Sequence, residues 1–259
     1  MNPAPSTSHL VLIPSYNSGA LVLRTVREAL AQWAPVWVVV DGSTDGTDAQ
    51  LQALAVNEPH LRVLVLPVNR GKGAAVLHGL QSAHGEGYTH ALTMDADGQH
   101  PASHIGAFMA ASQRDPEAMV LGVPQFDASA PALRRRGRRI SNWWANLETL
   151  GAGVRDSLFG FRVYPIAPLI DVMQSRRWMR RFDFDPEATV RLVWAGVPPL
   201  NLPAPVRYLT AAEGGVSHFN YLRDNVLLTG MHIRLMIEFL LRLPLLLLRR
   251  RQPLAAKPE

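Results

Sequence analysis

Two aspartates in the segment Asp95-Ala96-Asp97-Gly98-Gln99 are the side chains of this 259-residue chain best suited to chemistry. Carboxylates two positions apart point the same way as long as the backbone stays extended. Together with Gln99 they offer the hard oxygen ligands that Mg²⁺ and Mn²⁺ prefer. A divalent ion held here would neutralise a diphosphate leaving group, whereas the alternative for such a sequence is an ordinary surface turn. We therefore predict a Mg²⁺ or Mn²⁺ site at Asp95, Asp97 and Gln99.

A second candidate is the segment Asn69-Arg70-Gly71-Lys72-Gly73. It could place backbone N–H groups and a lysine near phosphates at the start of a helix. It is not a Walker A loop, because its glycine spacing differs and neither Ser nor Thr follows Lys72. The alternative is a turn with exposed cations, so this segment alone decides little.

The elements that must position these residues alternate along the first hundred residues. Apolar runs predict strands at residues 10–13, 36–40, 61–66 and 91–94, and helical spacing predicts helices at 20–33, 47–56 and 73–83. This alternation, with short connections, predicts a mostly parallel sheet with helices on both faces, in which ligands bind at the carboxyl ends of the strands. Four polar segments follow those strands and should line one crevice: residues 14–17, 41–43, 69–73 and 95–97.

The second half of the chain is less regular. We expect strands at residues 120–125, 161–164 and 206–209, the last preceded by a proline-rich segment, and helices at 131–150, 187–194 and 221–248. A break is expected near Pro244, because proline cannot donate the helical hydrogen bond. Trp143 and Trp144 are expected in the core. The predicted organisation is one α/β domain over residues 1–222, an amphipathic helix over 223–251 and a tail over 252–259.

Charge and hydropathy indicate the location of the protein in the cell. Arginines cluster at 134–139 and at 249–251, and such clusters suit phosphate-rich partners or an anionic membrane surface. Residues 226–248 are very apolar but contain Arg234, Glu238, Arg242 and Pro244, so we do not expect a spanning helix. No cysteine is present, which excludes disulfides and thiolate metal sites, and the first residues do not resemble a signal peptide. We predict a cytoplasmic protein peripheral to the cytoplasmic face of a membrane, and no nucleic-acid partner.

Four ordered motifs and three later segments together resemble the family 2 inverting glycosyltransferases, which have the GT-A fold. The motifs are Pro14-Ser15-Tyr16-Asn17, the stretch from Val38 to Thr47, Asn69 to Ala75 and Met94 to Pro101. The later segments are Phe159 to Tyr164, Phe182 to Glu187 and Val206-Arg207-Tyr208. These are most similar to the branch that contains dolichyl-phosphate mannose synthase and other polyprenyl-phosphate sugar transferases. The resemblance implies a GT-A, Rossmann-like sheet, a nucleoside-diphosphate sugar donor and a lipid-linked or lipid-like acceptor.

The resemblance also implies roles on the donor side. Residues of the nucleotide-sugar pocket would be Pro14, Tyr16, Asn17, Asp41, Lys72, Gly73 and Asp95. Asp97 and Gln99 would hold the metal against the diphosphate, with Asp95 at the ribose or in the metal shell. One departure is visible: the family usually has two consecutive aspartates after its second strand, and here Val40 stands in the first position.

On the acceptor side the resemblance implies that Arg207, Ser217 and His218 close over the phosphates. Arg134 is a candidate for capturing an anionic acceptor or headgroup, and the alternative is a solvated helix face. Glu187 occupies the branch's acceptor-side carboxylate position. A hydroxyl acceptor needs a general base, whereas a phosphate acceptor is already ionised, so Glu187, or Asp185 two residues earlier, would be a base in the first case and an orienting group in the second. The alternative is a carboxylate that only stabilises a helix N-terminus.

The predicted function is transfer of a hexose, with inversion, from a nucleoside-diphosphate sugar to a membrane-associated acceptor, either polyprenyl phosphate or a lipid-like hydroxyl. Asp185, Glu187 and Asp97 are the predicted catalytic residues. Two alternatives come from other classes. A nucleotidyltransferase that makes the sugar nucleotide would need a glycine- and arginine-rich loop after its first strand, where this chain has Pro14-Ser15-Tyr16-Asn17. A catalytically silent membrane-binding module would not need intact metal ligands. The oligomeric state cannot be read from the sequence.

Overall fold

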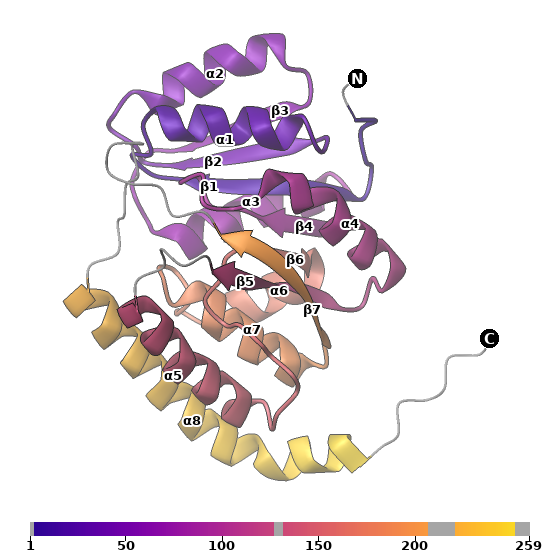
Figure 1. Ribbon diagram of the computed structural model, residues 1–259, viewed down its shortest axis with the longest axis vertical. Helices are drawn as coiled ribbons and strands as arrows, with labels where there is room; N and C mark the ends of the chain where they lie inside the picture. Colours follow the sequence, from indigo (N-terminus) through magenta and orange to yellow (C-terminus); the bar gives the residue numbers. More distant parts are fainter. Residues whose placement is uncertain (1–2, 127–131, 207–220, 252–259) are drawn as a thin grey trace.

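A seven-stranded sheet in the order β3-β2-β1-β4-β6-β5-β7 runs through the computed structural model, which describes residues 3–126, 132–206 and 221–251 (Figure 1). The strands are β1 (His9–Ser15), β2 (Val36–Asp41), β3 (Leu61–Leu66), β4 (His90–Thr93), β5 (Met119–Phe126), β6 (Arg162–Pro165) and β7 (Pro199–Val206). Only β6 runs antiparallel to its neighbours, β4 and β5. The predicted mostly parallel sheet is confirmed.

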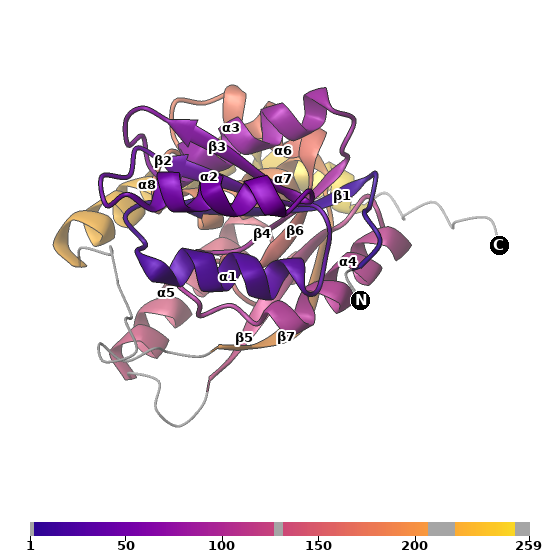
Figure 2. The same ribbon diagram turned by 90° about the horizontal axis from the view of Figure 1, so that it is seen from above.

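Helices cover both faces of the sheet, as the strand–helix alternation predicts. The alternation of side chains along β1 shows why: Leu10 and Leu12 join one core cluster, and Val11 and Ile13 join the other. One face carries α1 (Ala20–Leu30), α2 (Thr47–Asn57), the short turn η1 (Ala102–His104) and α4 (Ile105–Arg114). The other face carries α3 (Lys72–Gly85), α6 (Ile166–Gln174) and α7 (Phe184–Ala195), and Figure 2 shows the two layers.

Two long helices, α5 (Ala132–Glu148) and α8 (Tyr221–Arg251), lie side by side at one edge of the domain (Figure 1). α8 is fixed to α7 by ion pairs: Arg191 holds Glu238 through two contacts of 2.8 and 2.9 Å, and Arg234 lies 3.1 Å from Glu187. The charged residues that interrupt this apolar helix therefore face the domain. Over the described residues no helix has both the length and the hydropathy to cross a membrane.

The structure departs from several expectations. The last strand, β7, begins within the proline-rich segment itself, and residues 207–209 of the expected strand lie outside the described residues. Among the described strands β7 pairs with β5 alone, and an edge strand tolerates proline where its missing N–H would face outward. α8 continues through Pro244, where both Leu240 and Pro244 are exposed. Helices α4 and α6 were not expected at all. Trp143 is 59% exposed instead of lying in the core.

Candidate functional site

A cavity of about 1230 Å³ opens at the carboxyl ends of β1, β2 and β4 and continues between α5 and α8. Its first part is lined by residues that follow strands, among them Pro14, Tyr16, Asp41, Asn69, Lys72, Asp95, Asp97 and Gln99. The prediction that four polar strand ends share one crevice is therefore confirmed. Its second part is lined by side chains of α5 and α8, so one space joins the strand ends to the helical edge of the molecule.

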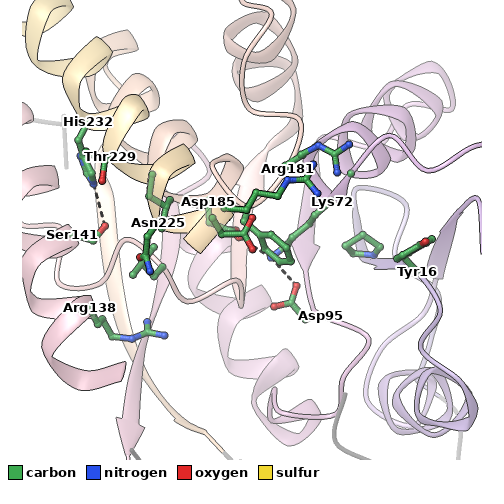
Figure 3. A pocket seen from close by; sticks show the side chains of 18 of the residues that line it. Tyr16, Lys72, Asp95, Arg138, Ser141, Arg181, Asp185, Asn225, Thr229 and His232 are labelled. Atoms are coloured by element: carbon green, nitrogen blue, oxygen red, sulfur yellow. Dashed lines mark hydrogen bonds and ion pairs between the residues drawn. The ribbon is translucent and has the colours of Figure 1, made fainter. Parts of the chain in front are cut away.

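At the centre of this cavity, Lys72 forms ion pairs with residues from two distant parts of the chain (Figure 3). Its Nζ lies 2.7 Å from Asp95 Oδ1, which follows β4, and 2.7 Å from Asp185 Oδ2, in the first turn of α7. Gly160 allows this arrangement, because a Cβ there would lie 2.7 Å from the Lys72 Nζ and 3.0 Å from Asp95 Oδ2. The Phe159-Gly160 turn thus closes one side of the bridge.

Burial and charge act against each other in this cluster. Burial opposes the charge on Lys72, but Asp185 and then Asp95 outweigh it and raise the pKa of Lys72 above its usual range. Burial likewise opposes ionisation of Asp95, but Lys72 and His100 hold the pKa of Asp95 below its usual value. Lys72 and Asp185 therefore form a largely buried ion pair at neutral pH, and Asp95, whose side chain is 31% exposed, joins it from the cavity side.

Asp97 differs from its neighbour because no cation lies against it in the described part of the chain. Burial and the negative charge of Asp95 raise the pKa of Asp97 to about 6. Its Oδ1 accepts a hydrogen bond of 3.0 Å from the Gln99 N–H, which folds residues 97–99 into a tight turn. A buried carboxylate that resists ionisation beside a second carboxylate is the electrostatic setting that a divalent cation relieves.

The oxygen donors at Asp95, Asp97 and Gln99 fit Mg²⁺ or Mn²⁺. Within residues 3–126, 132–206 and 221–251, no three His, Asp or Glu side chains converge to form a complete metal site. Mg²⁺ commonly takes one or two protein carboxylates and completes its shell with substrate phosphates and water. Two aspartates facing a phosphate-sized space meet that requirement.

His100 stabilises the turn that contains Asp95 and Asp97. Its Nδ1 accepts a 2.9 Å hydrogen bond from the Asp95 N–H, and its ring packs edge-on against Phe159. Burial lowers the pKa of His100 to about 4, so the ring is neutral at physiological pH. These contacts give His100 a structural role beside the turn of residues 95–99.

Asp41 organises the loop before α3. Its two carboxylate oxygens accept hydrogen bonds from the Arg70 N–H (2.9 Å) and the Gly71 N–H (2.7 Å). Gly71 lines the cavity, whereas Gly73, a predicted pocket residue, packs away from it. A Cβ at Gly73 would lie 2.0 Å from the Met179 carbonyl oxygen, so this glycine allows α3 to approach residues 179–184 closely.

The predicted residues at the end of β1 have two different roles. Pro14 and Tyr16 line the cavity, and the Tyr16 ring is 36% exposed at its mouth (Figure 3). Asn17 instead joins two loops: its Oδ1 accepts from the Thr44 N–H at 2.8 Å and its N–H donates to Ser43 Oγ at 3.0 Å. Asn17 therefore supports the rim of the cavity from a neighbouring position.

The structure separates the two carboxylates of α7. Asp185 lines the cavity beside Lys72, and its buried Oδ1 has no hydrogen-bond partner within the described residues. Glu187 is completely buried, and its oxygens accept from Arg191 at 2.8 Å and from Arg234 at 3.1 Å. This position does not fit the expected contact of Glu187 with an acceptor, because the side chain faces α8 rather than the cavity.

Two arginines that the sequence did not single out stand out in the structure. Arg162 is fully buried and donates to the carbonyl oxygens of Asp185 (2.7 Å) and Phe159 (2.6 Å), so it fixes both walls beside Lys72. Arg181 lines the cavity mouth near Lys72 (Figure 3). No periodicity marked either residue, although Arg162 lies in the Phe159 to Tyr164 segment that carries the family resemblance.

Several predicted acceptor residues cannot be placed. Arg207, Ser217 and His218 lie outside the described residues. Arg134 lies on α5, but its side chain is also outside the described part. From the same arginine cluster, Arg138 lines the cavity and is paired with the buried Asp156.

Comparison with known proteins identifies relatives of the whole arrangement. The profile of the family described as "Glycosyl transferase family 2" matches residues 10–172. The polyprenol monophosphomannose synthase of Mycolicibacterium smegmatis is 28% identical over 229 residues, which cover 82% of this chain and 81% of that protein. A dolichyl-phosphate beta-glucosyltransferase of Trichomonas vaginalis is 27% identical over 208 residues, which cover 69% of this chain and 58% of that protein.

Solved structures share the architecture. The glucosyl-3-phosphoglycerate synthase of Mycobacterium tuberculosis, crystallised with Mn²⁺, uridine diphosphate and phosphoglyceric acid, superimposes with a TM-score of 0.60. The match covers 93% of this chain and 83% of that one at 16% identity, which establishes the fold. The expected GT-A architecture is thereby confirmed.

Proposed function

Because this chain belongs to glycosyl transferase family 2, we propose that it moves a hexose from a nucleoside-diphosphate sugar to a membrane-associated lipid acceptor, with inversion at the anomeric carbon. The observation that carries the proposal is the strand-end cavity in which Lys72 joins Asp95 to Asp185. The printed names of two relatives, a polyprenol monophosphomannose synthase and a dolichyl-phosphate glucosyltransferase, support a lipid acceptor.

On the donor side, we assign Tyr16 and Pro14 to the nucleotide and Asp95, Asp97 and Gln99 to the diphosphate end. A structural neighbour crystallised with Mn²⁺ supports a divalent cation, and the oxygen donors suit Mg²⁺ as well. A divalent cation bound at Asp95 and Asp97 would stabilise the negative charge that develops on the leaving diphosphate. Asp41 keeps the loop before α3 in place, so its contribution to nucleotide binding includes the shape of the pocket wall.

In the transfer, the bond between the anomeric carbon and the diphosphate oxygen breaks and its electron pair leaves with the diphosphate. An acceptor oxygen forms the new bond from the opposite face. We assign Asp185 to the acceptor oxygen, because its side chain lines the cavity beside Lys72 and, among the buried carboxylate oxygens of the described chain, its Oδ1 is the one without a hydrogen-bond partner. A hydroxyl acceptor would give its proton to that oxygen.

The proposal includes attachment to a membrane surface through α5 and α8. Exposed apolar side chains of these helices are Ile140, Trp143, Leu147, Ile233, Ile237, Leu240, Leu241 and Leu248. An amphipathic helix buries such a face at the headgroup boundary, and the arginines at 249–251 would favour anionic lipid. With this attachment the acceptor half of the cavity would lie at the lipid surface, and the proposal keeps the predicted cytoplasmic face.

The first test is thermal unfolding of the purified chain with UDP, GDP, CDP or dTDP, with and without Mn²⁺. A ligand that binds only the native state stabilises it by about 2.7 kcal/mol at one hundred times its dissociation constant. We expect one nucleotide to raise Tm in a metal-dependent way, and we expect Asp97→Asn to remove the shift. Asp171→Asn, at an exposed position on α6, is the matched control and should keep it.

A second assay separates the alternatives. With the stabilising nucleotide's sugar conjugate, a transferase should release nucleoside diphosphate slowly even without acceptor. A nucleotidyltransferase would instead release pyrophosphate from the nucleoside triphosphate and sugar phosphate. Binding without release of either product would favour a silent module and would refute the proposed transfer.

A further inference from the structure

The loop between α6 and α7 concentrates positive charge beside α8. Residues 174–182, here called the arginine loop, contain four arginines and no acidic residue. Arg176 ties the loop to α8 by donating to Glu238 Oε2 at 3.2 Å. Arg177 and Arg181 are exposed, and neither forms an ion pair with a residue that the structure describes. The loop therefore presents cations to the outside that the described protein does not neutralise.

The backbone of the arginine loop is fixed at a strained residue. Met179 has φ 62°, a conformation that residues with a side chain seldom adopt and that persists only where surrounding contacts impose it. Asp183 supplies two of these contacts, because it accepts hydrogen bonds from the N–H groups of Met179 (3.1 Å) and Arg181 (3.0 Å). The turn buries the Met179 side chain and leaves its neighbour Trp178 46% exposed.

Trp178 borders the exposed side of α8. The Arg234 guanidinium of α8 lies over its ring, 4.1 Å from the ring centroid. Leu241 follows Arg234 by about two helical turns, so these two residues lie on nearly the same side of the helix. Ile237 lies between them, and both Ile237 and Leu241 are exposed. Arginines, an aromatic ring and aliphatic side chains thus meet at this side of the molecule.

The carboxylates next to this surface already have partners. Glu238 accepts hydrogen bonds from Arg176 and Arg191. Glu187 accepts hydrogen bonds from Arg191 and Arg234. Donors are nevertheless left over, since three buried guanidinium nitrogens have no hydrogen-bond partner in the described chain: Nε of Arg176, Nη1 of Arg180 and Nε of Arg234. The region lacks acceptors and negative charge, which is what an anionic ligand supplies.

The chemistry of the surface selects among anionic ligands. Arginine binds phosphate oxygens well, and tryptophan is favoured where one side of the ring is apolar and the other is wet. Exposed aliphatic residues beside them, such as Ile237 and Leu241, fit the boundary between headgroups and acyl chains. A nucleic acid or an acidic protein would match the arginines but would leave these aliphatic side chains in water.

Resting on the membrane attachment in the proposed function, we propose that the arginine loop is a binding surface for the headgroups of anionic phospholipids. Arg177 and Arg234 bind the headgroup phosphates and Trp178 lies at their level, while the exposed aliphatic side chains of α8 enter the acyl region. Arg181, at the other end of the loop, lines the mouth of the cavity. Headgroup binding at the loop therefore turns that mouth toward the membrane.

The test is sedimentation of the full chain with vesicles of phosphatidylcholine, either pure or containing phosphatidylglycerol. Arg177→Gln should weaken binding to the phosphatidylglycerol vesicles about fivefold, the contribution of one arginine near an anionic surface, and should leave binding to pure phosphatidylcholine unchanged. Trp178→Ala should weaken binding to both vesicles about tenfold, because apolar contact is lost. Arg27→Gln is the matched control and should bind like the wild type, since Arg27 is an exposed arginine of α1, far from α8 (Figure 1).

The Tm of each variant is measured to show that it folds. Binding to phosphatidylglycerol vesicles that Arg177→Gln leaves unchanged, or that Arg27→Gln weakens equally, would overturn the headgroup surface. Weaker binding of Arg177→Gln to polyglutamate or to an oligonucleotide, with unchanged vesicle binding, would assign the loop to a macromolecular partner and also overturn it. A wild type that binds neither vesicle would refute the membrane attachment as well, whereas the metal-linked nucleotide shift in Tm tests the transferase separately.

Discussion

Replacing Lys72 by methionine should destabilise the protein strongly at neutral pH and much less in mild acid. The side chain keeps its length but loses the charge that lies 2.7 Å from both Asp95 and Asp185. At an effective dielectric constant of about 20, each contact has a gross Coulomb energy of about 6 kcal/mol. Desolvation offsets much of this at Lys72 and Asp185, and the contact with Asp95, which is 31% exposed, is screened by solvent. Breaking a buried pair costs about 3–5 kcal/mol in measured cases. We expect Lys72→Met to lose about that much free energy of unfolding at pH 7.

The pH dependence of this loss of unfolding free energy shows whether charge causes it. In the wild type, Lys72 and His100 keep the pKa of Asp95 low, so the stability that this carboxylate contributes is present above its unfolded pKa and is lost as pH falls through its folded pKa. In Lys72→Met the carboxylates of Asp95 and Asp185 lose their cation and bind protons more readily. The gap between the variant and the wild type should therefore narrow as pH falls from about 7 to about 5.

The assay is urea unfolding followed by tryptophan fluorescence at both pH values, with Arg24→Met as control. Arg24 forms a half-exposed pair with Glu28 on α1, 3.0 Å apart, and such pairs contribute about 0–1 kcal/mol. If Lys72→Met loses as little free energy of unfolding as Arg24→Met, the stabilising role of the Lys72 ion pairs is refuted. A large loss that is the same at both pH values would assign it to packing instead of charge.

Three further outcomes follow from other parts of the structure. Release of nucleoside diphosphate should fall as pH drops below about 6, because the pKa of Asp97 is raised to about 6 and the protonated group is a poor metal ligand; a flat profile from pH 5 to 8 would contradict this. Burial lowers the pKa of His100 to about 4, so the free energy of unfolding should decrease by about 3 kcal/mol as pH falls from about 6.5 toward 4. In urea unfolding, His100→Gln should make the free energy of unfolding less dependent on pH over this range. Leu241→Glu should weaken binding to anionic vesicles, measured by sedimentation, at least about tenfold, since burying one leucine contributes about 1.5–3 kcal/mol. Val56→Glu is the control and should not weaken it, because Val56 is 83% exposed and belongs to α2, a helix at the opposite end of the molecule from α8 (Figure 1).

The sequence predicted the first half of the fold well because its signals are local. Each of the first four strands is a short apolar run with a polar segment behind it, and parallel pairing brings those segments to one edge without further information. The second half depends on long-range contacts. β7 is a strand because β5 offers it an edge, and α8 continues past Pro244 because its inner face is packed on α5 and α7.

The same limit applies to the site. Most predicted residues directly after strands line the cavity, and Asn17 and Gly73 do not. Spacing could not decide between Asp185 and Glu187, since both lie in the first turn of α7. What separates them is the partner that each meets: Lys72 comes from α3, and Arg191 and Arg234 come from α7 and α8. Gly73 was assigned to the pocket for its position in a motif, but it is required by the Met179 carbonyl oxygen on its other side.

Charge at the centre links the donor and acceptor proposals. Lys72 pairs with Asp95 and Asp185, Arg181 lies at the mouth of the same space, which Asp97 also lines, and a diphosphate would add negative charge there. A divalent cation offsets that excess on the donor side. An acceptor phosphate would add to it again, while an uncharged hydroxyl would not. Asp185 lines this space beside Lys72, where a hydroxyl acceptor could give its proton to the carboxylate.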